Sequence, residues 1–192
     1  VWDAIPMQLA KENKKFFFGQ IKKGARSSEF ELAIQWLLDC GLIYKVNRVN
    51  EPHMPLKAYQ SMNAYKLFMM DVGLLGALSE LPAEAILEGN DIFVEFKGAL
   101  TEQYVLQQMI SDTPYTPYYY GTDKGTFEQD FLIQKERNIV PIEVKAEGNL
   151  RSQSLKAYCE KFHPNMAVRL SALKYKEQDW MINLPLYAVC NL

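Results

Sequence analysis

Apolar side chains recur at helical spacing in two stretches of the first forty residues. The first stretch opens after Asp3 and carries Ile5, Leu9 and Phe16, and the second runs over residues 30–40 and ends at Gly41, as helices commonly do. The pattern predicts a short helix, a longer helix and then a strand over residues 42–49. Helix, helix, strand in a short basic segment is the order of a winged helix-turn-helix module, with a purely structural helical subdomain as the alternative.

The rest of the chain alternates between apolar runs, helical spacing and turn residues. Up to residue 90 the pattern predicts a loop over 51–61, a strand or helix entry over 64–70, a short helix capped by Asp71, and a linker over 82–90. A helix over 93–110, an aromatic strand over 118–120 and a turn over 121–125 are predicted next. The remainder is predicted to form strands over 127–134 and 139–146 joined by a turn at 135–138, a helix over 154–162, and strands over 166–170 and 184–189. We therefore predict an α+β fold in two parts, residues 1–90 and residues 91–192.

Charge is distributed unevenly between these parts. The chain holds 21 Lys and Arg against 23 Asp and Glu, a net charge of -2. Residues 1–60 hold nine basic and six acidic side chains, which leaves 12 against 17 for the remainder. The N-terminal part is the better candidate for contacting phosphates, and its basic residues in question are Lys14, Lys15, Lys22, Lys23 and Arg26.

Cysteine spacing and hydropathy indicate the cellular setting of the chain. Cys40, Cys159 and Cys190 lie far apart and have no partner at metal-ligand spacing, which favours a reducing, cytoplasmic setting. No apolar run approaches the 18 residues of a membrane span, and the first residues carry no signal pattern. We expect a soluble piece of a longer protein.

A candidate catalytic group follows from the two strands joined at residues 135–138. Side chains alternate along a strand, so Glu128, Asp130 and Leu132 are expected on one face of the first strand, and Glu143 and Lys145 on one face of the second. A hairpin sets these faces side by side. Two carboxylates and an amine would then converge.

That grouping suits metal-assisted cleavage of a phosphodiester. Mg²⁺ prefers hard oxygen ligands and keeps waters for substrate or nucleophile, so Asp130 and Glu143 would hold Mg²⁺ or Mn²⁺. Lys145 would orient the attacking water and offset charge in the transition state. Glu102 falls inside the apolar arc of the preceding helix, which suggests a further ligand or a holder of metal-bound water. The alternatives are a solvated sheet face for Glu143 and Lys145 and an edge position for Glu102.

The order of these motifs resembles a known group of proteins. The matching segments are Lys97 to Glu102, Glu128 to Phe131, Ile142 to Lys145 and Ser152 to Tyr158, with Ile5 to Ala10, Lys66 to Phe68, Asp71 to Leu75, Arg169 to Ser171 and Leu184 to Tyr187 elsewhere in the chain. They resemble the C-terminal winged-helix and PD-(D/E)XK nuclease-like region, a domain of unknown function, of prokaryotic AAA-type ATPases. The resemblance implies a restriction-endonuclease-like mixed sheet flanked by helices, metal held at Glu102, Asp130 and Glu143, and Lys145 as the lysine of the motif.

Two departures from the family pattern matter. Gln129 stands where the motif has proline, and no G-x-x-x-x-G-K-[ST] sequence occurs, so ATP would bind only to an upstream module absent from this chain. The sequence thus predicts a Mg²⁺-dependent nuclease domain that acts on nucleic acid. The alternative is a catalytically silent module of the same fold that binds DNA or protein. A third possibility is a surface for a neighbouring ATPase subunit, formed by Tyr115, Tyr118, Tyr119 and Tyr120.

Overall fold

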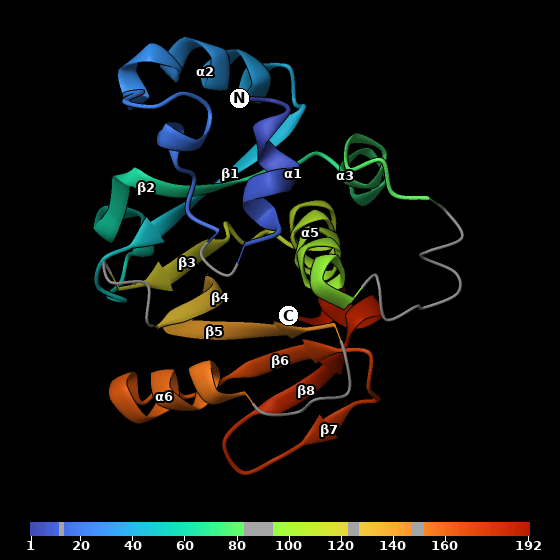
Figure 1. The fold of residues 1–192 in the computed structure, drawn as a ribbon. Helices are drawn as coiled ribbons and strands as arrows, with labels where there is room; N and C mark the ends of the chain where they lie inside the picture. Colours follow the sequence, from blue (N-terminus) through green and yellow to red (C-terminus); the bar gives the residue numbers. More distant parts are fainter. Residues whose placement is uncertain (12–13, 83–93, 123–126, 147–151) are drawn as a thin grey trace.

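A computed structural model describes residues 1–11, 14–82, 94–122, 127–146 and 152–192. In this part of the chain the strands form one eight-stranded mixed sheet, in the order β2-β1-β3-β4-β5-β6-β8-β7, with helices packed on both faces (Figure 1). The expected α+β class, a mixed sheet flanked by helices, is confirmed.

The element bounds follow the predicted pattern closely. The helices are α1 (Ala4–Leu9), α2 (Glu31–Asp39), α3 (Val72–Leu78), α5 (Val94–Asp112) and α6 (Gln153–Phe162), with 3₁₀ turns at Phe18–Gln20, Ser27–Glu29, Leu56–Tyr59 and Leu186–Asn191. The strands are β1 (Ile43–Val49), β2 (Gln60–Met69), β3 (Tyr118–Gly121), β4 (Glu128–Lys135), β5 (Asn138–Lys145), β6 (Val168–Ser171), β7 (Lys176–Glu177) and β8 (Ile182–Pro185).

Local signals explain the ends of several elements. The Asp71 carboxylate accepts from the Leu74 backbone N–H at 2.8 Å and caps α3 as predicted. Gly41 follows α2 with φ +69°, a backbone conformation that suits glycine. The strand predicted over 184–189 is wrong from residue 186 onward, because the chain leaves the sheet at Pro185 and turns into a 3₁₀ helix. Residues 83–90 of the predicted linker and 123–125 of the predicted turn lie outside the described residues.

The sheet runs through both of the predicted parts. β1 and β2 form an antiparallel pair, and β1 then pairs in parallel with β3 through Arg48–Tyr119 and Val49–Tyr120. The side chains of Ile5 and Leu9 in α1 share one apolar cluster with Ile142 of β5. The N-terminal helices and strands therefore pack as part of the same sheet structure, and the winged-helix interpretation stays a prediction.

The two faces of the sheet are covered by different helices. Ile142 and Val144 of β5 lie in the cluster that includes Val105 and Leu106 of α5. On the other face, Leu132 packs with Tyr158 of α6, in the lower part of Figure 1. We call these the α5 side and the α6 side.

Candidate active site

β4 and β5 part at one end of their hairpin. Their pairing runs from Lys135–Asn138 to Phe131–Ile142, and β5 then continues against β6 through Glu143, Val144 and Lys145. In place of a further backbone bond from β4, the Asp130 carboxylate accepts from the Val144 N–H at 2.8 Å. Asp130 thus lies at the fork between the two strands.

A shift of register in β4 changes which side chains share a face. Tyr118 pairs with Leu132 but Tyr120 pairs with Gln129, so three residues of β4 advance where β3 advances two. Opposed residues share a face, which puts Gln129 on the α6 side and its neighbour Glu128 on the α5 side. The strict alternation that sets Glu128 and Leu132 on one face is therefore wrong.

Glu143 and Lys145 lie together as predicted. The Lys145 amine is 2.6 Å from a Glu143 carboxylate oxygen, and Glu143 is 3% exposed. The other Glu143 oxygen accepts from the Gln129 amide at 3.4 Å. Ile142 and Val144 are buried on the opposite face, as expected of this strand.

Helix α5 carries Glu102 to the same fork from the α5 side. Glu102 is 5% exposed, which confirms that its carboxylate points inward. The helix is fixed against the N-terminal strands because the Gln103 amide exchanges two hydrogen bonds with the Met69 backbone, at 2.9 and 2.8 Å. Gln107 also accepts from the Val72 N–H at 3.0 Å.

Two lysines of the N-terminal segment reach this group. The Lys14 amine pairs with the Glu102 carboxylate. Lys66, fully buried on β2, is 2.5 Å from a Glu128 carboxylate oxygen and 4.8 Å from the centre of the Tyr119 ring. We call the seven charged residues from the two sides of the fork the acidic centre: Lys14, Lys66, Glu102, Glu128, Asp130, Glu143 and Lys145.

The ionisable groups of the acidic centre influence one another. Burial, then the carboxylates of Glu102 and Glu143, raise the pKa of Asp130 well above its ordinary value. Burial also raises the pKa of Glu143, against the opposing effect of Lys145. Burial would raise the pKa of Glu102 too, but Lys14, Lys66 and Lys145 outweigh it and lower that pKa.

The lysines respond in the opposite sense. Burial would lower the pKa of Lys66, but the carboxylates of Glu128, Glu102 and Asp130 outweigh burial, so that pKa is raised. The pKa of Lys145 is raised for the same reason, mainly by Glu143. All four residues predicted for catalysis and metal binding are therefore within electrostatic reach of one another.

The donor atoms of the acidic centre fit a hydrated Mg²⁺ only in part. Among the described residues, Glu102 Oε2 and Gln129 Oε1 are buried acceptors without a hydrogen-bond donor, so each could accept from a ligand or a metal-bound water. Mg²⁺ is commonly held by one or two carboxylates plus water and phosphate. However, no three His, Cys, Asp or Glu of the described chain are arranged to hold an ion together.

A second buried polar group lies on β6 and β8, beyond Glu143. Arg169, which faces Glu143 in the β5–β6 register, donates to the Asn183 side-chain oxygen at 2.8 Å. Ser171 donates to the same oxygen at 2.8 Å, and Ser152 accepts from Arg169 at 3.5 Å. We call this set the Arg169–Asn183 network.

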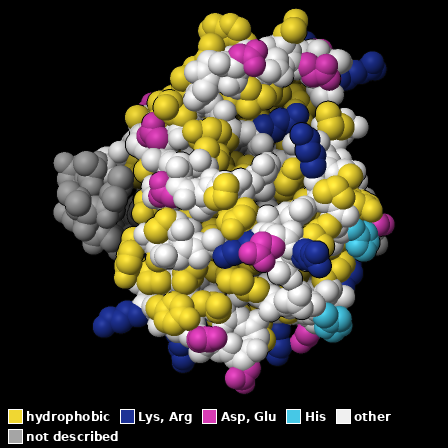
Figure 2. All heavy atoms as spheres, turned by 180° about the vertical axis from the view of Figure 1, so that it is seen from behind, with side chains coloured by type: hydrophobic (Ala, Val, Ile, Leu, Met, Phe, Trp, Pro, Cys, Tyr) yellow, Lys and Arg dark blue, Asp and Glu magenta, His cyan; other side chains and the backbone are white. Residues whose placement is uncertain are grey.

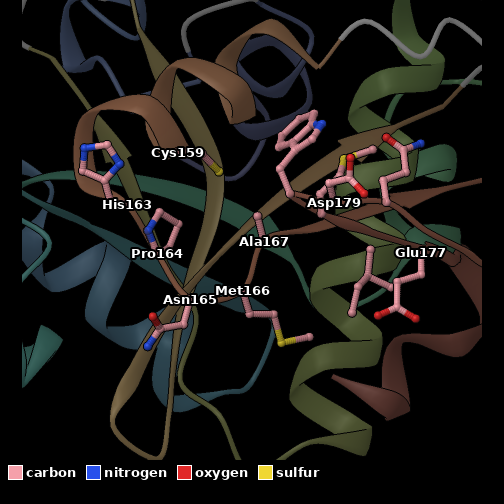
Figure 3. A pocket seen from close by; sticks show the side chains of 12 residues that line it. Cys159, His163, Pro164, Asn165, Met166, Ala167, Glu177 and Asp179 are labelled. Carbon is pink, nitrogen blue, oxygen red and sulfur yellow. The ribbon is translucent and has the colours of Figure 1, made fainter.

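A cavity of about 440 Å³ opens elsewhere, between α6 and the β7–β8 hairpin (Figure 3). Cys159 and His163 lie on one wall and Glu177 and Asp179 on the other. Burial raises the pKa of the Cys159 thiol, which disfavours the nucleophilic thiolate. The cysteine of this cavity is therefore not activated as a nucleophile.

The N-terminal basic residues differ in their surroundings. The Lys14 side chain is largely buried against Glu102, whereas Lys22 is exposed 4.0 Å from Glu29, and the phosphate contacts of this segment stay a prediction. Figure 2 shows Lys and Arg scattered among apolar and acidic side chains on one face of the molecule. Tyr118, Tyr119 and Tyr120 are buried, which corrects the proposal that they form a protein-binding surface.

Sequence reasoning missed Lys66, Glu128 and Gln129 as members or neighbours of the site. One signal was available: Lys66 stands inside the apolar run of β2, and a charged residue in a buried strand needs a partner of opposite charge. The position of Gln129 follows from the register shift in β4, which alternation does not reveal.

Two family models match separate parts of the chain. Residues 97–188 match a domain of unknown function (DUF4143), which is known in AAA-ATPase-associated proteins, and residues 1–85 match a second domain of unknown function (DUF8612). No curated protein matches significantly. In the described residues no helix is both long and apolar enough to cross a membrane.

One solved structure is similar to the chain, protein VC1899 from Vibrio cholerae. It matches 99% of this chain and 47% of its own, with 13% sequence identity and a TM-score of 0.26. The chain thus spans about half the length of that protein.

Proposed function

We propose that the acidic centre is a Mg²⁺- or Mn²⁺-dependent phosphodiesterase site that acts on nucleic acid. The observation that carries this proposal is the fork itself, where Asp130 bonds to the Val144 backbone beside the Glu143–Lys145 pair and interacts electrostatically with Glu102. Crowding carboxylates in a buried place is unfavourable without a cation, so such a group is retained more readily for chemistry than for stability.

Each residue has a role that suits its surroundings. Asp130 and Glu143 are the ligands nearest the fork, and Glu102 holds a third position or a metal-bound water. A bound divalent cation supplies Lewis-acid activation of the phosphate and a water of lowered pKa. Lys145 keeps Glu143 oriented and, being partly exposed, can orient the attacking water and offset negative charge on the phosphate.

The proposed site would be part of a longer, ATP-driven protein. The DUF4143 match is consistent with an AAA-type ATPase in the same polypeptide, upstream of Val1, and ATP would act only through that module. The segment matched by DUF8612 is the proposed winged-helix-like part that helps to contact nucleic acid.

A second candidate is a catalytically silent module of the same fold that binds DNA or protein. The observation that favours it is the pairing of Glu102 with Lys14 and of Glu143 with Lys145, which already neutralises two of the three carboxylates. In this case the fold is retained for contacts, and the carboxylates serve as internal ion pairs.

Cleavage and metal binding together distinguish the two candidates. Single-stranded, duplex and branched DNA and RNA are incubated with Mg²⁺ or Mn²⁺ and with this chain or the longer protein that carries the ATPase. Mn²⁺ affinity is measured by calorimetry. Lys145→Ala should reduce the cleavage rate by about 10² to 10³ while Mn²⁺ still binds, because it removes one electrostatic contact.

Asp130→Ala should weaken Mn²⁺ binding and abolish cleavage. Lys156→Ala is the matched control, since Lys156 is an exposed lysine of α6 that pairs with Glu160, and it should cleave like the wild type. Wild-type protein that cuts nothing in either form, or cuts equally well after both substitutions, would overturn the phosphodiesterase proposal for the acidic centre.

A further inference from the structure

The acidic centre draws its charges from two segments that different family models match. Its carboxylates come from α5, β4 and β5, all within the part that begins at residue 94. Lys14 and Lys66 come from residues 1–82, the part that the other model matches. The centre is therefore complete only when both segments are packed together.

Lys66 is the more deeply placed of the two lysines. Its side chain is 0% exposed, and its amine lies between the Glu128 carboxylate and the face of the Tyr119 ring. A buried ammonium without carboxylates nearby would lose most of its hydration with no electrostatic interaction to compensate for the loss. Glu128, Glu102 and Asp130 all interact favourably with this charge, so Lys66 and the carboxylates stabilise one another.

The Lys14 amine forms an ion pair with the Glu102 carboxylate. It pairs with Oε1 of Glu102, while Oε2 of Glu102 has no hydrogen-bond donor among the described residues. The side chains of Lys14 and Glu102 are 13% and 7% exposed, so water screens this pair weakly. A cation that binds Glu102 must therefore compete with the Lys14 amine.

Four cationic side chains face four carboxyl groups near the fork when the neighbouring Arg169 is included, because its guanidinium interacts with Glu143. Lys14, Lys66, Lys145 and Arg169 stand against Glu102, Glu128, Asp130 and Glu143. These internal cations weaken the attraction of the carboxylates for a divalent cation, since attraction follows the sum of nearby charges.

We infer that Lys14 and Lys66 are positioning residues that act as internal counter-cations, so that the N-terminal segment sets how strongly the acidic centre binds a divalent cation. Lys14 does so by direct competition for Glu102, and Lys66 by its electrostatic interaction with Glu128, Glu102 and Asp130. The inference uses the cation-binding part of the proposed function and makes no use of cleavage.

Mn²⁺ titration by calorimetry tests this inference on the whole chain. Lys14→Met and Lys66→Met should each tighten the Mn²⁺ dissociation constant by about tenfold or more, because a unit charge within a few ångströms is removed from a poorly screened place. Lys66→Met with Glu128→Gln restores the charge balance and should return to within about threefold of the wild type. Lys22→Met, a change of an exposed lysine in the same segment, should leave the constant unchanged.

The alternative is that both lysines only stabilise the fold. In that case the variants lose stability in urea unfolding and bind Mn²⁺ no better than the wild type, and this result overturns the inference. Should Lys66→Met fail to fold, Lys14→Met and the double variant still decide the question, and absence of Mn²⁺ binding in both counts against it.

Failure of the proposed function has a different signature. Wild-type protein that binds no Mn²⁺ and cuts nothing, while Lys14→Met binds Mn²⁺, supports the counter-cation role and ends the phosphodiesterase proposal. Wild-type protein that cleaves while Lys14→Met binds Mn²⁺ no more tightly ends the counter-cation role alone.

Discussion

The acidic centre and the Arg169–Asn183 network are two buried polar groups on neighbouring strands, and they differ in how well their atoms are satisfied. In the network, Asn183 accepts from both Arg169 and Ser171 and also donates to the backbone of Lys174 at 2.9 Å. In the acidic centre, Glu102 Oε2 and the neighbouring Gln129 Oε1 have no donor within the described chain, and carboxylates crowd together.

The difference indicates different uses for the two groups. A fully bonded buried network fixes strands in place, because each of its atoms would be expensive to leave unpaired. A crowded group of carboxylates with unpaired acceptor atoms is unfavourable for folding. Its presence is better explained by binding of a ligand than by a contribution to stability. Substitution of Asn183 should therefore destabilise the protein, whereas substitution of Asp130 or Gln129 at the fork should leave its stability unchanged or raise it.

The largest expected effect is at the centre of the network. Asn183→Ala should lower the free energy of unfolding by about 3 kcal/mol, because it leaves Arg169 and Ser171 without their shared acceptor. Urea unfolding followed by circular dichroism measures the change. Asn191→Ala, at an exposed asparagine, is the control, and a loss below about 1 kcal/mol for Asn183→Ala would contradict the comparison.

Gln103, which lies outside both the network and the acidic centre, shows how much stability a buried structural amide contributes. Gln103→Met should cost about 2 kcal/mol, since both hydrogen bonds to the Met69 backbone are lost and its N–H and C=O stay buried. The same unfolding assay applies. An unchanged midpoint would mean that α5 is held to β2 by apolar contacts alone.

A smaller and opposite effect is expected at the fork. The raised pKa of Asp130 means that the folded protein holds this proton more tightly than the unfolded chain does. The free energy of unfolding therefore falls as pH rises above the ordinary Asp range and levels off above the folded-state pKa. Asp130→Asn removes this penalty and should add about 1 kcal/mol at pH 8.

The Asp130→Asn variant should also show a weaker fall of stability between pH 4 and pH 8, measured by urea unfolding at each pH. Asp39→Asn, at an exposed position of α2, provides the reference slope. A variant less stable than the wild type at pH 8 would mean that Asp130 is held mainly by its bond to Val144.

The smallest expected effect concerns Gln129. Its amide makes one long bond, to Glu143, and its oxygen has no donor in the described chain. Gln129→Met keeps the shape and should change the free energy of unfolding by no more than about 0.5 kcal/mol, in contrast to Gln103→Met. A loss near 2 kcal/mol would show that Gln129 belongs with the structural amides.

Much of the fold and of the site was predictable from local pattern. Helical period alone placed Glu102 inside α5, and strand period with a hairpin turn brought Glu143 and Lys145 together beside Asp130. These inferences depend on neighbours within one or two elements, where spacing along the chain fixes direction in space.

The rest depends on contacts between distant segments. Lys14 and Glu102 are 88 residues apart, and neither residue carries a local signal that selects the other. The register shift in β4 arises from its pairing with β3, so the alternation of β4 by itself predicted the wrong face for Glu128. Tertiary context likewise turned the apolar run after Pro185 into a 3₁₀ helix.

The parallel pairing of β1 with β3 has a consequence for the order of folding. The hairpins β1–β2 and β4–β5 join residues close in sequence, whereas Arg48 and Tyr119 are brought together across the intervening chain. Closing a long loop loses more chain entropy than closing a short one, so non-local pairings form slowly and late. Because Lys66 and Glu128 lie on opposite sides of this seam, the acidic centre should be assembled in the last step, when the two prefolded halves of the sheet join.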